Sequence, residues 1–439
     1  MRRIQAGNAL SAFGLGFTVP YLYVYVAQVR GLGAGTAGVV LAVFALAALV
    51  VLPFTGRVID RRGPLPVLVG GALVASGGAL AMGVAGSVPT AVAAAALLGA
   101  GTAVLQPALA TMIVRSSTSA TRTRAFATQF FLANLGLGVG GLIGGQLVDE
   151  HRPGTFLLLF AVEAVMFLVL AGMAATVRLP GARAVLPGVS SAAAVEGGLR
   201  GVVRHRAMVW LCLLGFLVFF ACYGQFESGL AAYGTEAAGI GPSTLGVALA
   251  ANTAVIVAAQ FVVLRLVERR RRSRVIAVVG VVWAFAWAVA GFAGLGPGGQ
   301  AVATAAFVST YALLGLGEAM LAPTVAPLVA DLAPAGAVGR YNSAFALVKQ
   351  VALAVGPAVG GPMGAALHGP YIVTFVLCSL GVTVLALRLG RLLTPVQDQP
   401  SAAGGSRVVA QGAAAPGAAP SVREGEFAPD GLAAPGRPA

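Results

Sequence analysis

Long apolar runs alternate with short polar segments along most of the chain. Twelve of these runs reach the length that a helix needs to cross the hydrocarbon core of a bilayer, about 20 residues. The predicted spans are 4–28, 36–55, 65–87, 89–114, 125–148, 154–177, 207–233, 242–264, 275–296, 300–329, 342–367 and 370–389. The pattern predicts an all-α membrane protein with twelve transmembrane helices.

Two parts of this pattern occur twice, in the same order. The motif in 97–107 returns in 313–323, 216 positions later, and the motif in 31–42 returns in 239–250, 208 positions later. Such duplication predicts two parallel six-helix repeats around a central cavity. In membrane proteins, parallel halves are typical of transporters in which one half moves against the other.

The repeat also divides the chain into segments. We expect an N-terminal six-helix half at 1–177 and a C-terminal half at 207–390. Residues 178–206 form a cytoplasmic linker, with a short surface helix expected near 195–206. Residues 391–439 are dominated by Ala, Gly, Pro and Ser without apolar periodicity, which predicts a disordered cytoplasmic tail.

Composition and charge support the membrane assignment and set its orientation. Apolar residues make up 58% of the chain, charged residues 10%, and the mean hydropathy is +0.90. The net charge of +14 does not indicate nucleic-acid binding, because 20 of the 28 Lys and Arg residues lie in alternate loops on one side. This distribution predicts a multi-pass plasma-membrane protein in contact with the lipid bilayer, with both termini in the cytoplasm.

The sequence offers no enzyme chemistry. Cys212, Cys222 and Cys378 fall inside predicted spans and have neither disulfide nor metal-ligand spacing. No phosphate-binding P-loop and no nucleophile–base arrangement occurs. We therefore expect no catalytic residues, no metal and no cofactor, and a transporter driven by an ion gradient.

A loop between spans two and three carries a candidate gate. It reads Gly56-x-x-x-Asp60-Arg61-Arg62-Gly63. Gly56 allows close helix approach, and Asp60 can accept hydrogen bonds from a facing helix N-terminus or from an Arg. We predict that Gly56, Asp60, Arg61 and Gly63 hold the halves shut on the inner side. The alternative is a solvated loop that only sets topology.

Spans five and eleven carry stacked small residues. They are Gly140, Gly141, Gly144, Gly145, Gly356, Pro357, Gly360 and Gly361. Small residues four apart let two helices pack backbone to backbone. Ordinary tight packing and a specialised role in export are both consistent with this pattern.

With these motifs the chain resembles the major facilitator superfamily over nearly its whole length. The loop matches the superfamily's signature at its four named residues and departs from it at Pro64 and Leu65. The span-eleven motif is similar to that of the 12-span drug/proton antiporter group. Span four has Ala94, Ala95 and Ala96 where the family commonly carries an Arg. The resemblance implies alternating access coupled to protons, with spans one, four, seven and ten lining the cavity.

Four ionisable residues lie inside predicted spans, where charge is costly and usually functional. They are Glu163, Glu227, Glu318 and Lys349, and their repeat partners are Ser379, Val19, Thr102 and Ala133. Substrate or proton candidates are Glu227, Glu318 and Lys349, with Gln225 two residues from Glu227. Glu163 ranks last because the resemblance places span six at the periphery.

Glu318 and Lys349 are at similar depth on consecutive helices, so we expect them to form an ion pair. The pair is either a permanent bridge or one that opens when Glu318 is protonated. Neutral polar residues in the spans, including Asn252, Gln260 and Gln225, are more often interhelical hydrogen-bond partners than ligands.

The leading hypothesis is proton-coupled efflux of small hydrophobic or weakly cationic compounds, with protons and the small-molecule substrate as partners. Proton-coupled uptake of a polar metabolite remains an alternative. So does a transporter-like scaffold or sensor without transport, which the departures in the loop and in span four allow.

Overall fold

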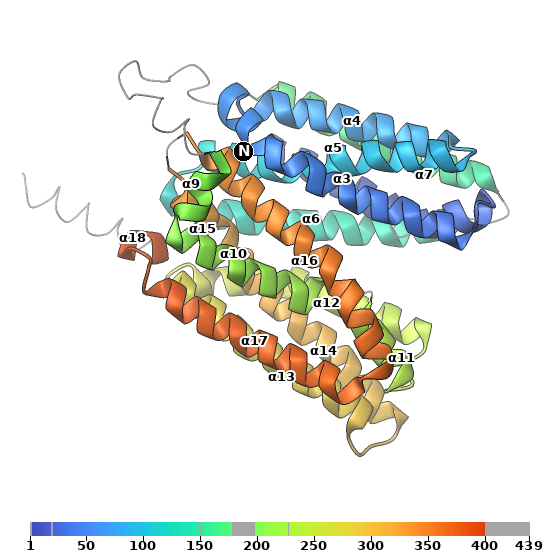
Figure 1. Cartoon of the computed structure of the whole chain (residues 1–439), viewed down its shortest axis with the longest axis vertical. Coiled ribbons are helices and arrows are strands. Elements are labelled where there is room, and N and C mark those ends of the chain that lie inside the picture. Colours follow the sequence, from blue (N-terminus) through green and yellow to red (C-terminus); the bar gives the residue numbers. More distant parts are fainter. Residues whose placement is uncertain are drawn as a thin grey trace, which may run out of the picture.

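A computed structural model describes residues 2–18, 21–148, 152–177, 198–226, 228–334 and 336–399. Within these ranges every regular element is a helix (Figure 1). The first part of the chain contains α1 (Arg2–Thr18), α2 (Leu22–Val24), η2 (Tyr25–Val29), α3 (Gly33–Arg62), α4 (Pro64–Val84), α5 (Val88–Arg115), α6 (Ser119–Leu147) and α7 (Pro153–Ala175). The second part contains α9 (Gly198–Arg204), α10 (Arg206–Val218), η3 (Phe219–Tyr223), α11 (Gly229–Glu236), α12 (Pro242–Val267), α13 (Arg272–Leu295), α14 (Gln300–Leu321), α15 (Val325–Leu332), α16 (Val338–Ala366), α17 (His368–Gly390) and α18 (Pro395–Asp398).

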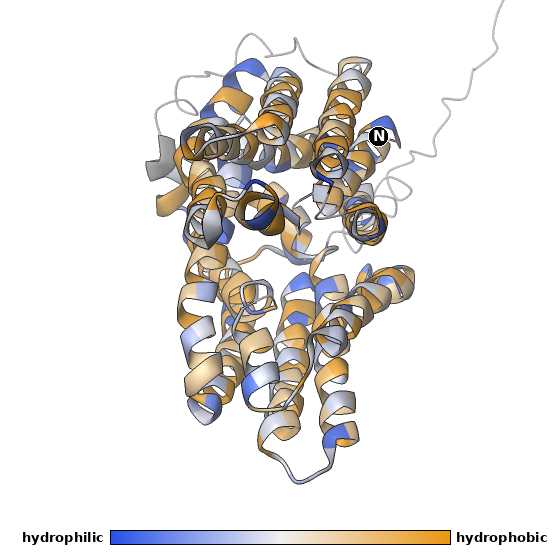
Figure 2. Ribbon diagram, turned by 90° about the vertical axis from the view of Figure 1, so that its right-hand side faces the viewer, coloured by the Kyte–Doolittle hydropathy of each residue, from blue (hydrophilic) through white to orange (hydrophobic). Residues whose placement is uncertain are grey.

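The number of membrane-crossing segments agrees with the sequence pattern. Eleven helices in the described ranges are long and apolar enough to cross a bilayer, and the count is twelve if α1 and the segment α2–η2, bent by 45°, form one broken span. Apolar residues cover most of these helices (Figure 2). The prediction of a twelve-span, all-α membrane protein is confirmed.

The helices form two bundles that follow the order of the chain (Figure 1). In the first half α4 packs on α5 and α7, and α1 packs on α6 and α7. In the second half α13 packs on α14 and α17, and α12 packs on α14. The two halves meet where α3 packs on α16 and where α6 packs on α12.

Equivalent glycines hold the equivalent helices together in each half. A Cβ atom added at Gly99 of α5 would overlap the carbonyl oxygen of Phe44 in α3. A Cβ atom at Gly315 of α14 would lie 2.7 Å from the carbonyl oxygen of Asn252 in α12. Phe44 and Asn252 are themselves 208 positions apart, so the same contact occurs twice.

A second pair of glycines, two residues further along each helix, contacts another neighbouring helix in each half. Gly101 backs onto the backbone of Ala75, and Gly317 backs onto the Trp283 indole, whose nitrogen donates to the Leu314 carbonyl at 3.0 Å. Ala75 and Trp283 are again 208 positions apart. The duplicated sequence therefore encodes duplicated helix packing.

The small residues of spans five and eleven pack against spans one and seven. Gly140 and Gly144 approach the carbonyl oxygens of Phe13 and Phe17 in α1. Their partners Gly356 and Gly360 approach Gly224 and Gln225 just after η3.

Three other glycines of these motifs have different surroundings. The Gly141 carbonyl accepts a 2.7 Å hydrogen bond from the Tyr21 hydroxyl, and Gly145 lies against the same hydroxyl. Gly361 has no described atom near its Cβ position.

Spans one and seven are discontinuous at corresponding places. The first interruption follows Thr18, and the second follows Tyr223, before α11 begins at Gly229. At the offset of 208 positions, α11 corresponds to the segment that begins at Tyr21. Discontinuous helices inside a membrane are typical of transporter binding regions.

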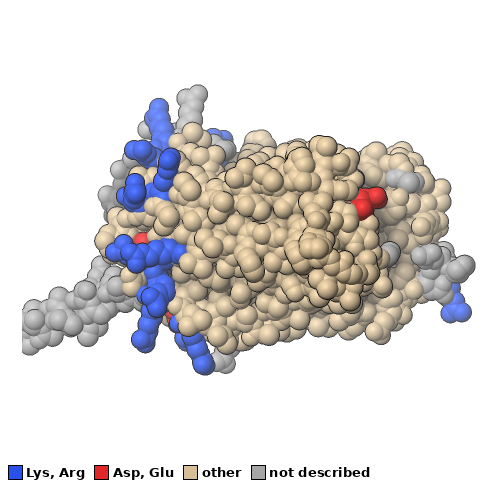
Figure 3. Space-filling view, turned by 90° about the horizontal axis from the view of Figure 1, so that it is seen from below, with Lys and Arg blue, Asp and Glu red and all other residues tan. Residues whose placement is uncertain are grey.

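Exposed arginines gather at one end of the molecule, here named the basic end (Figure 3). Its members include Arg57, Arg61, Arg62, Arg115, Arg265, Arg269, Arg270, Arg274, Arg388 and Arg391. Most of them lie in or next to the alternate polar loops, and Arg388 and Arg391 lie at the end of α17. The short helix α9 falls within the segment where a linker helix was expected.

Gly99→Ala is expected to lower the thermal unfolding temperature by several degrees, because the new methyl group would overlap the Phe44 carbonyl and overpacking costs about 1–3 kcal/mol. Gly38→Ala is the matched control, since a Cβ atom at Gly38 meets nothing within 4 Å in the described structure. Thermal unfolding of the purified proteins in detergent compares them. Equal unfolding temperatures would contradict the proposed role of close packing at Gly99.

Candidate functional site

Asp60 joins the two halves at the basic end. Its carboxylate accepts hydrogen bonds from the backbone N–H of Gly339 at 2.7 Å and from that of Arg340 at 3.2 Å, and the Arg340 Nε donates at 2.9 Å. Both amides belong to the first turn of α16, where unpaired N–H groups and the helix dipole favour an anion. The side chains of Asp60 and Arg340 are only 10% and 13% exposed.

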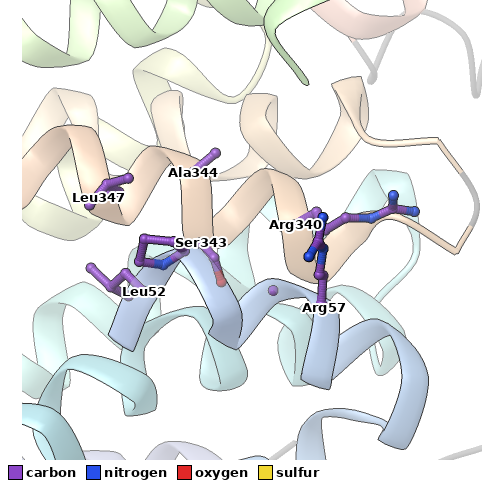
Figure 4. Close-up of a pocket in the computed structure, with 8 residues that line it drawn as sticks. Leu52, Arg57, Arg340, Ser343, Ala344 and Leu347 are labelled. Carbon is purple, nitrogen blue, oxygen red and sulfur yellow. The ribbon is translucent and has the colours of Figure 1, made fainter. Parts of the chain in front are cut away.

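Glycines on both helices permit this contact. A Cβ atom at Gly56 would lie 2.6 Å from the Arg340 Cα, and one at Gly339 would lie 2.7 Å from the Asp60 Oδ1. Next to the contact, a small pocket opens between α3 and α16. Its lining residues are Leu52, Pro53, Gly56, Arg57, Arg340, Ser343, Ala344 and Leu347 (Figure 4).

The other two residues of the loop motif have different surroundings. Gly63 ends α3 with φ of +88°, a conformation that favours glycine, and Pro64 then starts α4. Arg61 is exposed, and no hydrogen bond or ion pair is found for it in the described part of the chain. The geometry thus brings Gly56 and Asp60 into the contact between the halves, uses Gly63 for the turn, and leaves Arg61 at the surface.

The repeat supplies a second, weaker copy of the Asp60–Arg340 pair. Glu268 lies 208 positions after Asp60, and Arg124 lies 216 positions before Arg340. Their side chains meet at 3.5 Å, with exposed fractions of 28% for Glu268 and 68% for Arg124. The two pairs therefore join α3 to α16 and α12 to α6 in the same pseudo-symmetric way.

The second pair is looser because its glycines have been replaced. Leu264 stands at the position equivalent to Gly56, and Thr123 at the position equivalent to Gly339. The Thr123 hydroxyl accepts a 3.4 Å hydrogen bond from Arg272 of α13. Loss of small residues at a helix crossing keeps the backbones apart.

A third link at the basic end was not found from the sequence. Asp331 of α15 forms an ion pair with Arg122 of α6 and accepts a 2.6 Å hydrogen bond from Arg272 of α13. Arg272 is 3% exposed, so its charge depends on such partners. One sequence signal was available, since Asp331 is an acid at the position whose repeat partner is Arg115.

The segment after span twelve docks on this network. The Arg272 Nη1 donates to the Gln397 carbonyl at 3.0 Å, and the Asp398 carboxylate accepts from the Ser273 N–H at 2.8 Å and from its hydroxyl at 2.9 Å. Asp398 thus caps the start of α13. The expectation of a disordered tail from residue 391 is wrong for 391–399, because a buried carboxylate and helix α18 fix this part. Residues 400–439 lie outside the described ranges.

Glu318 lies inside the second half. It is 2% exposed and accepts a 2.8 Å hydrogen bond from the Asn252 side chain, which also donates to the Tyr311 carbonyl at 3.3 Å. Asn252 lies on α12 and Glu318 on α14, so the expectation of an interhelical hydrogen bond from Asn252 is confirmed. The equivalent positions in the first half hold Phe44 and Thr102.

Lys349 does not form the expected ion pair. No contact within 4.0 Å joins it to Glu318 in the described structure, although the two charges are near enough to attract each other. The Lys349 Nζ instead lies 5.0 Å from the centre of the Phe219 ring. The Glu318 carboxylate is hydrogen-bonded by Asn252, and the Lys349 ammonium lies against the Phe219 ring.

Aromatic side chains surround these groups. Phe219 packs on Tyr223 and on Phe345, and Phe226 stacks on Tyr311 with ring centres 5.5 Å apart. All except Tyr311 are half-buried. A buried carboxylate, an ammonium group and several aromatic rings therefore meet where α14 and α16 face η3.

The remaining candidates have different positions. Gln225 is fully buried: it donates to the Phe220 and Gly356 carbonyls at 2.9 and 3.2 Å, and it accepts from the Tyr371 hydroxyl at 3.2 Å. It therefore connects α16 and α17 to the break in span seven. Glu227 lies outside the described residues. Glu163, which was ranked last, is fully buried in α7.

Comparison with known proteins places this arrangement in a family. The sequence profile described as Major Facilitator Superfamily matches residues 6–357 and 235–423. The chain belongs to the major facilitator superfamily. Its structure is similar to that of the transporter FucP in the outward conformation, with a TM-score of 0.74 at 15% identity over 88% of this chain and 98% of FucP. The likeness to FucP thus concerns the fold.

Two further solved structures share the fold. A bacterial homologue of the iron transporter ferroportin, in an outward-facing state, gives a TM-score of 0.72 at 14% identity, over 89% of this chain and 99% of that one. The proton:xylose symporter XylE gives 0.65 at 13% identity, over 88% and 94%. Superfamily membership makes this chain a multi-pass membrane transporter, and the drug/proton antiporter group stays a prediction.

Asp60→Ala is expected to open the basic end, because it removes three hydrogen bonds to a charged group, each worth about 1.5–3 kcal/mol. The readout is the alkylation rate of a cysteine placed at Ser343, in a background without the three native cysteines. We expect an increase of roughly tenfold or more. Arg61→Ala is the control, and a similar increase in that variant would contradict the role of Asp60.

Ending the chain after Leu393 is expected to lower the thermal unfolding temperature, because Ser273 and Arg272 lose the partners that Asp398 and Gln397 supply. A chain that ends after Gln399 keeps all of these contacts and serves as the control. Thermal unfolding of both truncated proteins and of the full chain gives the comparison. If the shorter chain unfolds like the full chain, the docked segment does not stabilise the basic end.

Proposed function

We propose that this transporter exports small hydrophobic or weakly cationic compounds in exchange for protons, by alternating access. The basic end faces the cytoplasm of a plasma-membrane protein, in agreement with the positive-inside distribution of charge. Asp60–Arg340, Glu268–Arg124 and Asp331 with its two arginines close this side in the conformation described here. Opening toward the cytoplasm then requires these links to break.

The observation that carries the proposal is the buried Glu318 beside half-buried aromatic rings. An ionised carboxylate inside a membrane protein is costly, and binding either a proton or a cation lowers that cost. Aromatic rings bind hydrophobic groups and also attract cations through their faces. Glu318 can therefore bind a proton or attract a weakly cationic compound, but protonation removes the charge that attracts the cation. The two ligands therefore exclude each other at Glu318, which is the basis of exchange.

Lys349 and Asn252 adjust this competition. The ammonium of Lys349 lies over Phe219 and attracts Glu318 from beyond 4 Å, so it partly neutralises the carboxylate without occupying it. Asn252 holds the carboxylate on α12 while Glu318 itself belongs to α14. Protonation of Glu318 weakens this hydrogen bond, because the charge that strengthens it is lost. Proton binding is thereby linked to the packing of α12 on α14.

Glu227 and Gln225 complete the proposed site. Gln225 fixes the end of the break in span seven against α16, and Glu227 follows it by two residues. We propose that Glu227 adds a second negative charge for substrate or proton. Uptake of a polar metabolite by proton symport is the second candidate, and the structurally similar XylE is named a proton:xylose symporter. It agrees with the hydrogen-bonding groups of Gln225 and Asn252.

Glu318→Gln is expected to reduce substrate-triggered proton release at least about tenfold, because an amide cannot carry the proton. Glu227→Gln is expected to do the same while leaving expression intact. Everted membrane vesicles with an acidified lumen and a pH-sensitive dye provide the assay, with lipophilic cations, antibiotics and sugars added one at a time.

Glu236→Gln, which changes an exposed glutamate, and empty vesicles are the controls. Release triggered by a lipophilic compound supports efflux. Proton release that only sugars trigger would instead favour proton symport of a polar metabolite. Silence of correctly inserted wild-type protein across the panel would refute proton exchange and favour a scaffold or sensor.

A further inference from the structure

Glu163 is a buried acid that the proposed transport site does not use. It lies in the middle of α7, with an exposed fraction of 0%. Neither carboxyl oxygen has a hydrogen-bond partner among the described residues. Buried polar groups nearly always have such partners, so an unpartnered acid inside a membrane protein indicates a function.

The acid faces the end of α1. A Cβ atom at Gly14 would lie 3.3 Å from the Glu163 Cα and 3.5 Å from its Cγ, so α1 and α7 touch here. The Thr18 hydroxyl is near enough to interact with the carboxyl, but it donates a 3.2 Å hydrogen bond to the Gly14 carbonyl. Thr18 is the last residue of α1, and the helical segment Leu22–Val29 is inclined at 45° to α1. Glu163 therefore lies beside the discontinuity of span one.

No described charged group pairs with Glu163, and Arg30, which follows η2, donates instead to the Tyr25 hydroxyl and the Gly83 carbonyl. α4 has no ionisable residue, and α7 has none other than Glu163 itself. The Arg3 guanidinium contacts Thr176, thirteen residues from Glu163 along α7, which is roughly 20 Å by helix rise. The Tyr25 ring packs on Phe160, but its hydroxyl donates to the Gly83 carbonyl at 2.7 Å.

The repeat shows that the fold does not require an acid at this position. The partner of Glu163 is Ser379, whose hydroxyl donates to the Phe375 carbonyl of its own helix at 2.8 Å. The partners of Gly14 and Thr18 are Cys222 and Phe226. The equivalent position in the second half thus holds a small residue, Ser379, whose hydroxyl is hydrogen-bonded within its own helix.

We propose that Glu163 is a second proton-binding site, in the first half and apart from Glu318, which is protonated in the conformation described here and deprotonated when α1 moves. An ionised, unpartnered carboxylate is strongly disfavoured at this position, and the neutral acid is disfavoured much less. When α1 leaves α7, water enters and accepts the proton from the carboxyl O–H. The carboxylate takes a proton back before the helices close. This step rests on the proposed proton exchange and locates part of it in span one.

Infrared spectroscopy of the full chain in lipid tests the protonation state directly. At neutral pH the wild type is expected to show a carbonyl band of a buried protonated acid that Glu163→Gln removes. Glu236→Gln, an exposed acid, should leave that band unchanged. Glu163→Ser, which copies the repeat partner, is the second variant and should also remove it. Equal bands in the wild type and both Glu163 variants would overturn the inference.

The vesicle assay distinguishes this inference from the proposed function. We expect both Glu163 variants to lose proton release at least about tenfold, while substrate still moves down its own gradient. An active wild type with equally active Glu163 variants overturns the second site alone and leaves the exchange at Glu318 intact. A silent wild type overturns both.

Discussion

Close approach of helix backbones is the constraint on which this structure depends. Lipid tails are as apolar as the side chains that face them, so association of helices relies on packing and on interhelical hydrogen bonds. Gly99 and Gly315 provide that approach inside each half, and Gly56 and Gly339 provide it between the halves. The Asp60 contact and the Asn252–Glu318 hydrogen bond both form beside such a close approach of two backbones.

Duplication gave the two halves the same packing, and later substitutions gave them different chemistry. Phe44 and Thr102 pack in the first half where Asn252 and Glu318 form a hydrogen bond in the second. At another pair of equivalent positions the ionisable residue is in the first half, where Glu163 corresponds to Ser379 of the second half. Since the packing is the same without these polar groups, their presence reflects function more than folding.

The helices, the repeat and the family could be predicted from sequence because apolar length and residue spacing are local properties. The partner of Asp60 could only be described by type, because the first turn of α16 comes close to it through the tertiary fold. The expected Glu318–Lys349 ion pair does not form for a related reason, since equal depth along two helices does not determine which way each side chain points. Asn252 donates a hydrogen bond to Glu318 instead, and Lys349 lies against the Phe219 ring. Asp398 was missed because the composition of the tail concealed one capping residue.

The two pseudo-symmetric ion pairs at the basic end are unequal, and this gives their separation an order. In the Glu268–Arg124 pair the two side chains are 3.5 Å apart and Arg124 is 68% exposed, so salt and water weaken this contact readily. The Asp60–Arg340 pair is enclosed and carries three hydrogen bonds, so it resists rupture. Of these two pairs the Glu268–Arg124 pair would therefore separate first, while the Asp60–Arg340 pair and the buried link of Asp331 to Arg122 and Arg272 still join the halves. Duplication has in this way produced two equivalent contacts of unequal strength, so that one can separate while the other still holds.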